Sequence, residues 1–346
     1  MEKSNSRNNA IDAVRGLAII LVIIGHVIEV NVTGFYESTV FNIIWSLQMP
    51  LFMLISGYVT RYSAHINNKK GYFNYLLKRS LTYLLPWVIW TIFVKGLLLG
   101  STNFWAYIKY ITFSMDAGYW FLFSLWTISM IFGTATYIAN KFTNKNNLRI
   151  VITILVSIIF SVFLLIIGLK VGINFLGIKL TLYYLPFFYL GYLYANIENV
   201  YSERAWFKAA RQAVILPSIV VYAIIILNIN LYSMEDNISN ILIRMTASVL
   251  GCTIVFYTVS VSRFLASQNE RVGKALLLAG QYSLELYVVH ELLISIMDVI
   301  PKPEFLSVDG FILCTVNFIL MLLFLIIIIY CISANKWSRL ILFGKK

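Results

Sequence analysis

Long apolar runs separated by short polar breaks dominate the pattern along the chain. Two of them, 150–169 and 311–330, hold about twenty nearly uninterrupted apolar residues, the length at which a helix crosses the hydrocarbon core of a bilayer. Hydropathy, turn residues and charges together predict an all-α, polytopic helix bundle. The ten expected spans are residues 11–30, 41–60, 80–99, 119–139, 149–169, 180–197, 213–231, 241–262, 276–297 and 309–332.

Composition favours the same class of protein. Of the 346 residues, 60% are hydrophobic and 12% charged, which is more apolar surface than a soluble fold of this length can bury. We therefore expect a multi-pass protein of the cell membrane, with the lipid bilayer as its surroundings. The first eleven residues are polar and lack the apolar centre of a cleavable signal, so we expect the first span to remain in place. Without repeats or an appended soluble domain, residues 1–346 are expected to form a single transmembrane domain.

The distribution of charge predicts the topology. The formal net charge is +12, but no basic aromatic domain is present that could hold a nucleic acid, and none is expected as a partner. With ten spans both termini lie on one side, and most lysines and arginines fall in the loops of that side. The opposite loops hold only Lys109, Lys170, Lys179 and Lys302. By the positive-inside rule, both termini are expected to be cytoplasmic.

The cysteines give no sign of a metal or redox site. Cys252, Cys314 and Cys331 lie in apolar stretches without the spacing of such a motif. We expect them to pack or to face lipid, and we expect no metal cofactor.

Four ionisable residues interrupt the first span: Asp12, Arg15, His26 and Glu29. Such residues are costly in a membrane and are hypotheses of function by default. Steps of three and eleven residues are near whole helical turns, so all four lie on one face, with Arg15 and His26 about 16 Å apart along the axis. In the predicted topology His26 lies toward the outer half of the membrane, where it could act as a general base with Glu29 orienting its ring. Asp12 could equally reach to the lipid headgroups beside Arg15.

A series of sequence blocks resembles the acyltransferase-3 family of membrane proteins, which O-acylate glycans. IDAVRGLAIILVIIGH, from Ile11 to His26, is similar to the family's opening segment, in which ten residues separate an arginine from a histidine. Further blocks follow in the family's order and extend the resemblance to about residue 290. They are SLQMPLFMLISGYV (46–59), LKRSLTYLLPW (77–87), YWFLFSLW (119–126), LPFFYLGY (185–192) and YSLELYVVH (282–290).

The resemblance implies a substrate on each side of the membrane. The donor would be acetyl-CoA or another acyl-CoA in the cytoplasm, held through its phosphates by Arg15, Lys78 and Arg79. The acceptor would be a hydroxyl of a cell-surface or lipid-linked glycan at the outer face, reached directly or through a partner protein of the envelope. The family commonly has a second arginine where this chain has Thr82, which weakens the case for a paired phosphate clamp there.

Three further residues are candidates for binding the acceptor. Tyr287 and His290 lie on one face of the ninth span with Ser283, and Glu291 follows one turn beyond Tyr287. They could line an acceptor cavity or hold neighbouring helices together by hydrogen bonds. Trp120 could stack on a sugar ring or anchor its span at the membrane interface.

Two other functions fit the same polar residues. A proton-coupled transporter, or an exporter of a glycan or small polar solute, also carries buried Arg, His and acidic groups in its spans. A structural or signalling subunit of the membrane would bind no acyl donor. Turnover of acetyl-CoA distinguishes the enzyme from both alternatives.

Overall fold

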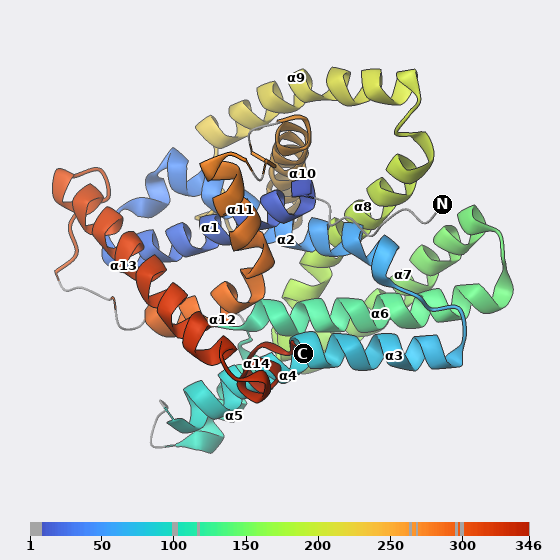
Figure 1. The fold of residues 1–346 in the computed structure, drawn as a ribbon, viewed down its shortest axis with the longest axis horizontal. Coiled ribbons are helices and arrows are strands. Elements are labelled where there is room, and N and C mark those ends of the chain that lie inside the picture. Colours follow the sequence, from blue (N-terminus) through green and yellow to red (C-terminus); the bar gives the residue numbers. More distant parts are fainter. Residues whose placement is uncertain are drawn as a thin grey trace. The chain divides into compact units, whose positions relative to one another are not determined.

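The protein is α-helical throughout the part of the chain that the structure describes. The structure is a computed structural model, and it describes residues 9–98, 103–115, 118–262, 265–267, 269–294, 297 and 301–345. These residues form no β-strand, only one bridge between Thr33 and Glu304. The expected all-α, polytopic class is thereby confirmed (Figure 1).

Eight helices in the described ranges are long and apolar enough to cross a membrane. They are α1 (Asn9–Asn31), α2 (Thr39–Ser63), the continuous helix Lys69–Leu97, α6 (Trp120–Phe142), α7 (Asn146–Val171), α9 (Ala205–Asn228), α10 (Ile238–Val261) and α13 (Val308–Ser333). The remaining α-helices are α5 (Phe104–Phe113), α8 (Ile178–Tyr201), α11 (Arg271–Gln281), α12 (Ser283–Ile294) and α14 (Lys336–Phe343). Two 3₁₀ turns cover Phe35–Glu37 and Phe175–Gly177.

Two of the ten expected spans are not among these eight helices. The span expected at 180–197 is present as α8, whose 24 residues extend about 36 Å, but its tyrosines and polar residues lower its hydropathy. The span expected at 276–297 is divided into α11 and α12 at Tyr282. Gly280, a weak helix former, lies two residues before this break. Residues 295–296 of that span lie outside the described residues.

The third span begins earlier than expected, at Lys69 instead of residue 80. It consists of α3 (Lys69–Arg79), a π-helical segment Ser80–Leu84, α4 (Leu85–Trp87) and a second π-helical segment Val88–Leu98. Pro86 lies between the two wide segments, and a proline in a helix removes a backbone donor and crowds the preceding turn. Wide turns of this kind are a recognised way to accommodate such a disturbance, and they are frequent at functional sites.

The described chain forms two compact units. Unit 1 contains residues up to Ser56 and Tyr194–Ile329, and unit 2 contains Gly57–Leu193 and Tyr330–Lys346. Unit 1 therefore holds α1, α9 to α12 and most of α13, whereas unit 2 holds α3 to α7 and α14. The expectation of a single transmembrane domain stays a prediction.

In unit 1, α1 and α11 touch backbone to backbone. A Cβ atom on Gly16 would overlap the carbonyl oxygen of Leu276, and one on Gly280 would overlap the carbonyl oxygen of Asp12. Small residues at such crossings allow helices in a membrane to approach closely, which increases their packing contacts. This contact fixes the start of α1 against α11.

The loop between α9 and α10, also in unit 1, is held by two buried polar side chains. Arg244 donates to the carbonyl oxygen of Leu231 at 3.0 Å, to that of Met234, and to the Asp236 carboxylate at 2.7 Å. Asn42 accepts from the Leu231 amide at 3.0 Å. Arg244, near the start of α10, thus fixes this loop.

In unit 2, α3 and α6 run side by side (Figure 1). The rings of Tyr72 and Tyr137 stack with their centroids 4.6 Å apart, and the Tyr72 hydroxyl lies 3.1 Å from that of Thr134. The third span also contacts α14, where Trp90 donates to the carbonyl oxygen of Leu342 at 2.7 Å.

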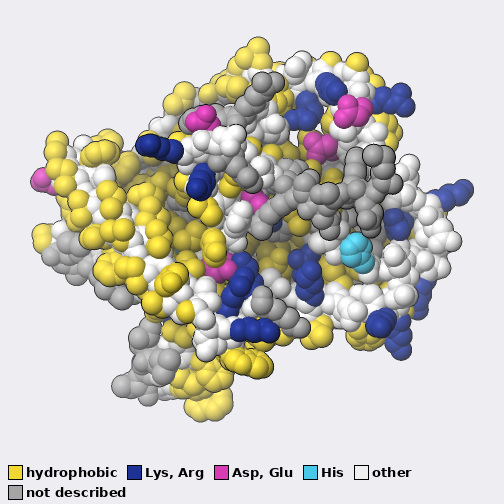
Figure 2. All heavy atoms as spheres, in the orientation of Figure 1, with side chains coloured by type: hydrophobic (Ala, Val, Ile, Leu, Met, Phe, Trp, Pro, Cys, Tyr) yellow, Lys and Arg dark blue, Asp and Glu magenta, His cyan; other side chains and the backbone are white. Residues whose placement is uncertain are grey.

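The outer face of α13 is apolar and uncovered. Phe311 is 72% exposed, and Figure 2 shows hydrophobic side chains gathered over this helix. The other large exposed side chains of α13 are Val308, Ile312, Val316, Ile319, Leu320, Leu323, Phe324, Ile326, Ile327 and Tyr330. A continuous apolar face of this kind suits contact with lipid chains.

Candidate active site

A histidine and a glutamate pair near the end of α1. His26 Nδ1 lies 3.1 Å from a carboxylate oxygen of Glu29, one helical turn away, and the two side chains are 34% and 39% exposed. A carboxylate accepts a hydrogen bond and cannot donate one when ionised, so this contact places a proton on Nδ1. Nε2 of the same ring then carries the lone pair that a general base needs.

Tyr232, from the loop between α9 and α10, approaches the same carboxylate. Burial raises the pKa of Tyr232, and the neighbouring Glu29 raises it further, so the phenol stays protonated and donates to Glu29. The loop that carries Tyr232 is the one that Arg244 fixes. Glu29 is therefore oriented by two donors, His26 and Tyr232.

A second histidine faces the first one from α12. The ring centroids of His26 and His290 lie 5.5 Å apart, although the two residues are near opposite ends of the chain. His290 is 0% exposed, and its Nδ1 lies 3.1 Å from the carbonyl oxygen of Leu286. A carbonyl oxygen only accepts, so Nδ1 carries the proton and Nε2 carries a lone pair. That Nε2 is buried and has no hydrogen-bond partner among the described residues.

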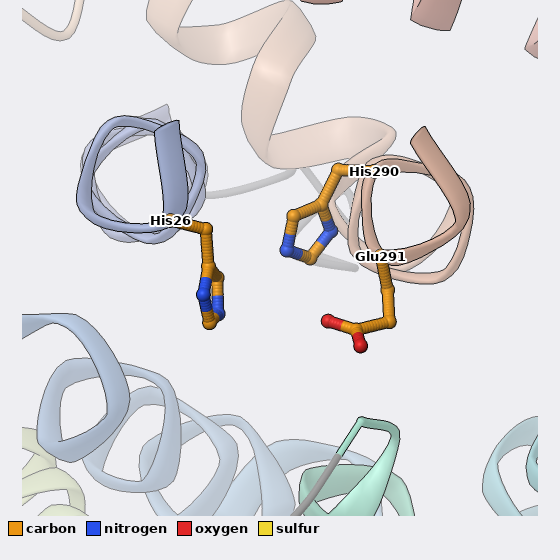
Figure 3. A group of neighbouring side chains, drawn as sticks. All are labelled: His26, His290 and Glu291. Carbon is orange, nitrogen blue, oxygen red and sulfur yellow. The ribbon is translucent and has the colours of Figure 1, made fainter. Parts of the chain in front are cut away.

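Glu291 completes a cluster of three side chains. Figure 3 shows His26 extending from α1 toward His290 and Glu291, which extend from α12 into the same space. One possible ligand atom from each residue lies within 4.8 Å of the others. Tyr287 is buried beside the cluster, with its ring centroid 5.6 Å from that of His290.

Arg15 lies far from this cluster along α1. Its guanidinium is 3.7 Å from the carboxylate of Asp12, in an i, i+3 pair near the start of the helix. The sequence placed the four ionisable residues of α1 on one face, and the structure pairs them locally, Asp12 with Arg15 and His26 with Glu29. The predicted role of Arg15 in binding the donor stays a prediction.

Arg79, in unit 2, is a half-buried cation whose described hydrogen-bond partners are neutral. It donates to the hydroxyls of Tyr83 at 3.2 Å, Ser63 at 3.1 Å and Thr60 at 3.4 Å. Its guanidinium also lies over the Tyr75 ring, 5.1 Å from the centroid. No carboxylate pairs with Arg79 among the described residues, and its buried Nε has no partner there.

Lys78 and Thr82, two neighbours of Arg79, differ in whether they add a positive charge that could bind an anion. Lys78 is exposed and precedes Arg79 directly. Thr82, which stands in place of the family's second arginine, donates to the carbonyl oxygen of Lys78 at 2.8 Å and so adds no positive charge. One arginine and one lysine are therefore available here.

Trp120 lies at the start of α6, in unit 2. Its ring stacks on that of Tyr184, with centroids 5.3 Å apart and planes 25° from parallel. One face of the indole is thus engaged within the protein. Trp126, one of the aromatic residues of the same helix, donates to the hydroxyl of Ser80 at 3.0 Å.

Comparison with known proteins decides the family. The acyltransferase-3 model, described as an acyltransferase domain, matches residues 8–342. The chain belongs to the acyltransferase-3 family. This confirms the resemblance that the sequence blocks indicated, and it makes the protein a membrane acyltransferase.

Two relatives of this acyltransferase-3 protein share the name nodulation protein NolL. The one from Sinorhizobium fredii is 27% identical over 201 residues, which cover 56% of this chain and 50% of the relative. The one from Mesorhizobium japonicum is 25% identical over 329 residues, covering 87% of this chain and 80% of the relative. The matched region thus spans half the length of the first relative. No solved structure matches the chain.

The positions of two residues of this candidate site, Glu291 and Tyr232, do not follow from the sequence alone. Its spacing places Glu291 one helical turn beyond Tyr287, and its charge within an apolar span is a second sequence signal. Tyr232 lies in a loop, and nothing in its sequence surroundings connects it with Glu29. Only the fold reveals that contact.

Proposed function

We propose that the protein is a membrane O-acyltransferase, an O-acetyltransferase in particular. It would transfer an acyl group from cytoplasmic acyl-CoA to a hydroxyl of a cell-surface or lipid-linked glycan at the outer face of the membrane. The observation that carries the proposal is the pair of His26 and Glu29, in a chain whose family is acyltransferase-3. A base oriented by a carboxylate is what activation of a hydroxyl requires.

The chemical step follows from the tautomer of His26. Nε2 accepts the proton of the acceptor hydroxyl while the hydroxyl oxygen attacks the thioester carbonyl carbon. The bond from that carbon to sulfur breaks, the acyl group stays on the oxygen as an ester, and CoA leaves as its thiolate. The imidazolium formed on His26 is stabilised by Glu29 and then returns its proton to the thiolate.

Binding of the donor is assigned to the basic residues on the predicted cytoplasmic side. Arg79 is the main candidate because its described partners are neutral, so a phosphate of CoA would supply a negative charge that none of these partners carries. Lys78 is exposed and could bind a second phosphate. Arg15 has Asp12 as a partner, and we assign it a secondary role.

Binding of the acceptor is assigned to His290, Tyr287 and Trp120. His290 holds a buried lone pair that can accept a hydrogen bond from a second sugar hydroxyl. Tyr287 borders the same space, and the stacked pair of Trp120 and Tyr184 could present an aromatic face to a sugar ring. A partner protein of the envelope, in place of a free glycan, would present its acceptor hydroxyl to the same base.

The test is acyl transfer by the purified protein in lipid vesicles, with labelled acetyl-CoA on the side of the termini and a glycan acceptor on the other side. We expect the label to appear on the glycan and free CoA to form in equal amount. Glycan that crosses the membrane without gaining label, and without loss of acetyl-CoA, would favour the transporter. Neither transport nor transfer, in a protein that binds no donor, would favour a structural subunit.

A further inference from the structure

We propose that His26, His290 and Glu291 form a binding site for a divalent transition metal ion, with Zn²⁺ the ion that fits best. The site is defined by ligand chemistry and geometry, and it does not rest on the proposed acyl transfer. Its three ligand atoms come from two helices and lie within 4.8 Å of one another (Figure 3).

The ligand set is one that zinc commonly uses. Two imidazole nitrogens and one carboxylate oxygen bind Zn²⁺ in catalytic sites and leave a fourth position open to water or another small molecule. Zn²⁺ has no geometric preference from its d electrons, so it tolerates an irregular arrangement better than most first-row ions. The absence of cysteine from the cluster argues against a closed structural site.

Both histidines already have the outer partners that are typical of metal ligands. A metal-binding histidine usually donates its other ring N–H to a carboxylate or a backbone carbonyl, which fixes the tautomer. Nδ1 of His26 donates its N–H to the carboxylate of Glu29, and Nδ1 of His290 donates its N–H to the backbone carbonyl of Leu286. Each ring would therefore bind the ion through Nε2.

The buried lone pair of His290 is an independent sign of a ligand. The side chain is 0% exposed, and Nε2 has no hydrogen-bond partner among the described residues. A buried polar atom left without a hydrogen-bond partner destabilises the folded protein. A metal ion would satisfy this atom, and Figure 3 shows the ring facing the space shared with His26 and Glu291.

Closure of the site needs a modest movement of side chains. Bonds of about 2.0–2.2 Å in a tetrahedron place ligand atoms roughly 3.4 Å apart. The atoms must therefore approach from separations of up to 4.8 Å. His26 and Glu291 are both partly exposed, so rotation of Glu291 and a small shift of His26 that keeps its contact with Glu29 can bring them toward the buried His290.

The test is binding of Zn²⁺ to the full chain, treated with EDTA and reconstituted in nanodiscs, measured by calorimetry. We expect one ion per chain. His290→Gln and Glu291→Gln each remove a ligand, and Glu29→Gln removes the charged outer partner of His26. Loss of an outer partner typically lowers metal affinity about 10–100-fold, and loss of a ligand lowers it at least as much. Substitution of Co²⁺ gives a second readout, since its visible spectrum reports nitrogen and oxygen ligands in tetrahedral geometry.

His65→Gln is the matched control. The chain has three histidines, and His65 is exposed and belongs to unit 2, whereas the cluster belongs to unit 1. Zinc affinity equal to the wild type in His65→Gln, with reduced affinity in the other three variants, supports the site. Equal affinity in all four variants means adventitious surface binding and overturns the proposal, as does the failure of the wild type to bind. If His290→Gln does not fold, the partly exposed Glu291 and Glu29 still provide the same comparison.

Discussion

The two ring nitrogens of His26 have different tasks. Nδ1 donates to Glu29, and Tyr232 donates to the same carboxylate. These two contacts fix Glu29 and thereby the orientation of the His26 imidazole. Nε2 carries the lone pair that can accept a proton or bind an ion. The same division holds for His290, where the Leu286 carbonyl takes the place of the carboxylate.

We expect His26→Gln to abolish acyl transfer. Glutamine retains polarity and approximate size but cannot accept a proton at neutral pH, so the contribution of the general base, about 10²–10⁴-fold, is lost. The measurement is transfer of labelled acetyl groups at saturating donor. CoA binding and the thermal midpoint should stay near wild type, and His290→Gln should give only a partial loss. Transfer by His26→Gln at a near wild-type rate would remove His26 as the base.

Zinc provides a different test of the same atom. A bound ion occupies Nε2 of His26, so Zn²⁺ should inhibit transfer and EDTA should restore it. His290→Gln should retain its residual activity at Zn²⁺ concentrations that inhibit the wild type, because its affinity for the ion is lower. The opposite pattern, in which EDTA abolishes transfer and Zn²⁺ restores it, would make the ion part of the catalytic machinery and contradict metal-free base catalysis.

Arg79→Ala should act on donor binding. A hydrogen bond to a charged group contributes about 1.5–3 kcal/mol, so the KM for acetyl-CoA should rise about tenfold or more, with a smaller change in kcat. Arg79→Lys keeps the positive charge but loses the planar guanidinium that can bind a phosphate through two hydrogen bonds. It should therefore give an intermediate KM for acetyl-CoA. Equal losses of rate at saturating and at limiting donor would count against phosphate binding by Arg79.

At the scale of helices, the contact of α1 with α11 positions the segment that carries the candidate base. Gly16 and Gly280 lie where a Cβ would meet a backbone carbonyl of the other helix, and backbone cannot rotate away as a side chain can. Any larger residue must separate the helices. The partner helix α11 leads directly into α12, so a shift there would also displace His290.

Gly16→Ala and Gly280→Ala should therefore destabilise the protein, by about 1–3 kcal/mol each, as overpacking does. Gly168→Ala is the matched control, since it also lies inside a helix, but its Cβ would meet the side chains of Ile173 and Ile178 at 3.0 and 3.2 Å. Side chains can adjust, and alanine is the better helix former, so this variant should be near neutral. Thermal unfolding in detergent gives the comparison. A Gly16→Ala protein as stable as the wild type would show that the helices are not held in direct contact.

Hydropathy predicted most of the helices because it responds to length and apolar content. It could not separate α11 from α12, because the short polar stretch at residues 281–283 lies between two mainly apolar segments and does not look like a helix break. It also placed the start of the third span late, because α3 carries Lys69, Lys70, Lys78 and Arg79 and reads as a polar loop. A helix that continues beyond the membrane leaves no hydrophobic signal.

For the whole molecule, the sequence predicts the pairs within α1, Asp12 with Arg15 and His26 with Glu29, but it does not predict the contact of α1 with α12. Spacing by three residues predicts that His26 and Glu29 meet, because such residues are neighbours on a helix. His26 and His290 come from helices near opposite ends of the sequence, and the spacing of residues along one helix cannot predict a contact between two helices. The cluster with Glu291 therefore emerges only from the fold.

The predicted topology can be tested on the intact protein by labelling of cysteines. After replacement of Cys252, Cys314 and Cys331, engineered cysteines at Lys69 and Asn144 should react only from the cytoplasm, and one at Glu235 only from outside. Glu235 is preferable to Asp236, because Asp236 pairs with Arg244 and its loss would disturb the loop. Labelling of residue 235 from the cytoplasm in intact cells would contradict the model of ten spans.

The neutral surroundings of Arg79 have a consequence for handling the protein. A ligand that binds only the folded state stabilises it, by about 2.7 kcal/mol at one hundred times its Kd. If CoA supplies the anion that the described neighbours of Arg79 lack, the protein should be most fragile in solutions without nucleotide. Addition of CoA during extraction from membranes should then raise the Tm and the yield. Arg79→Ala should be indifferent to the same addition, so a melting curve alone could reveal the donor before any acceptor glycan is identified.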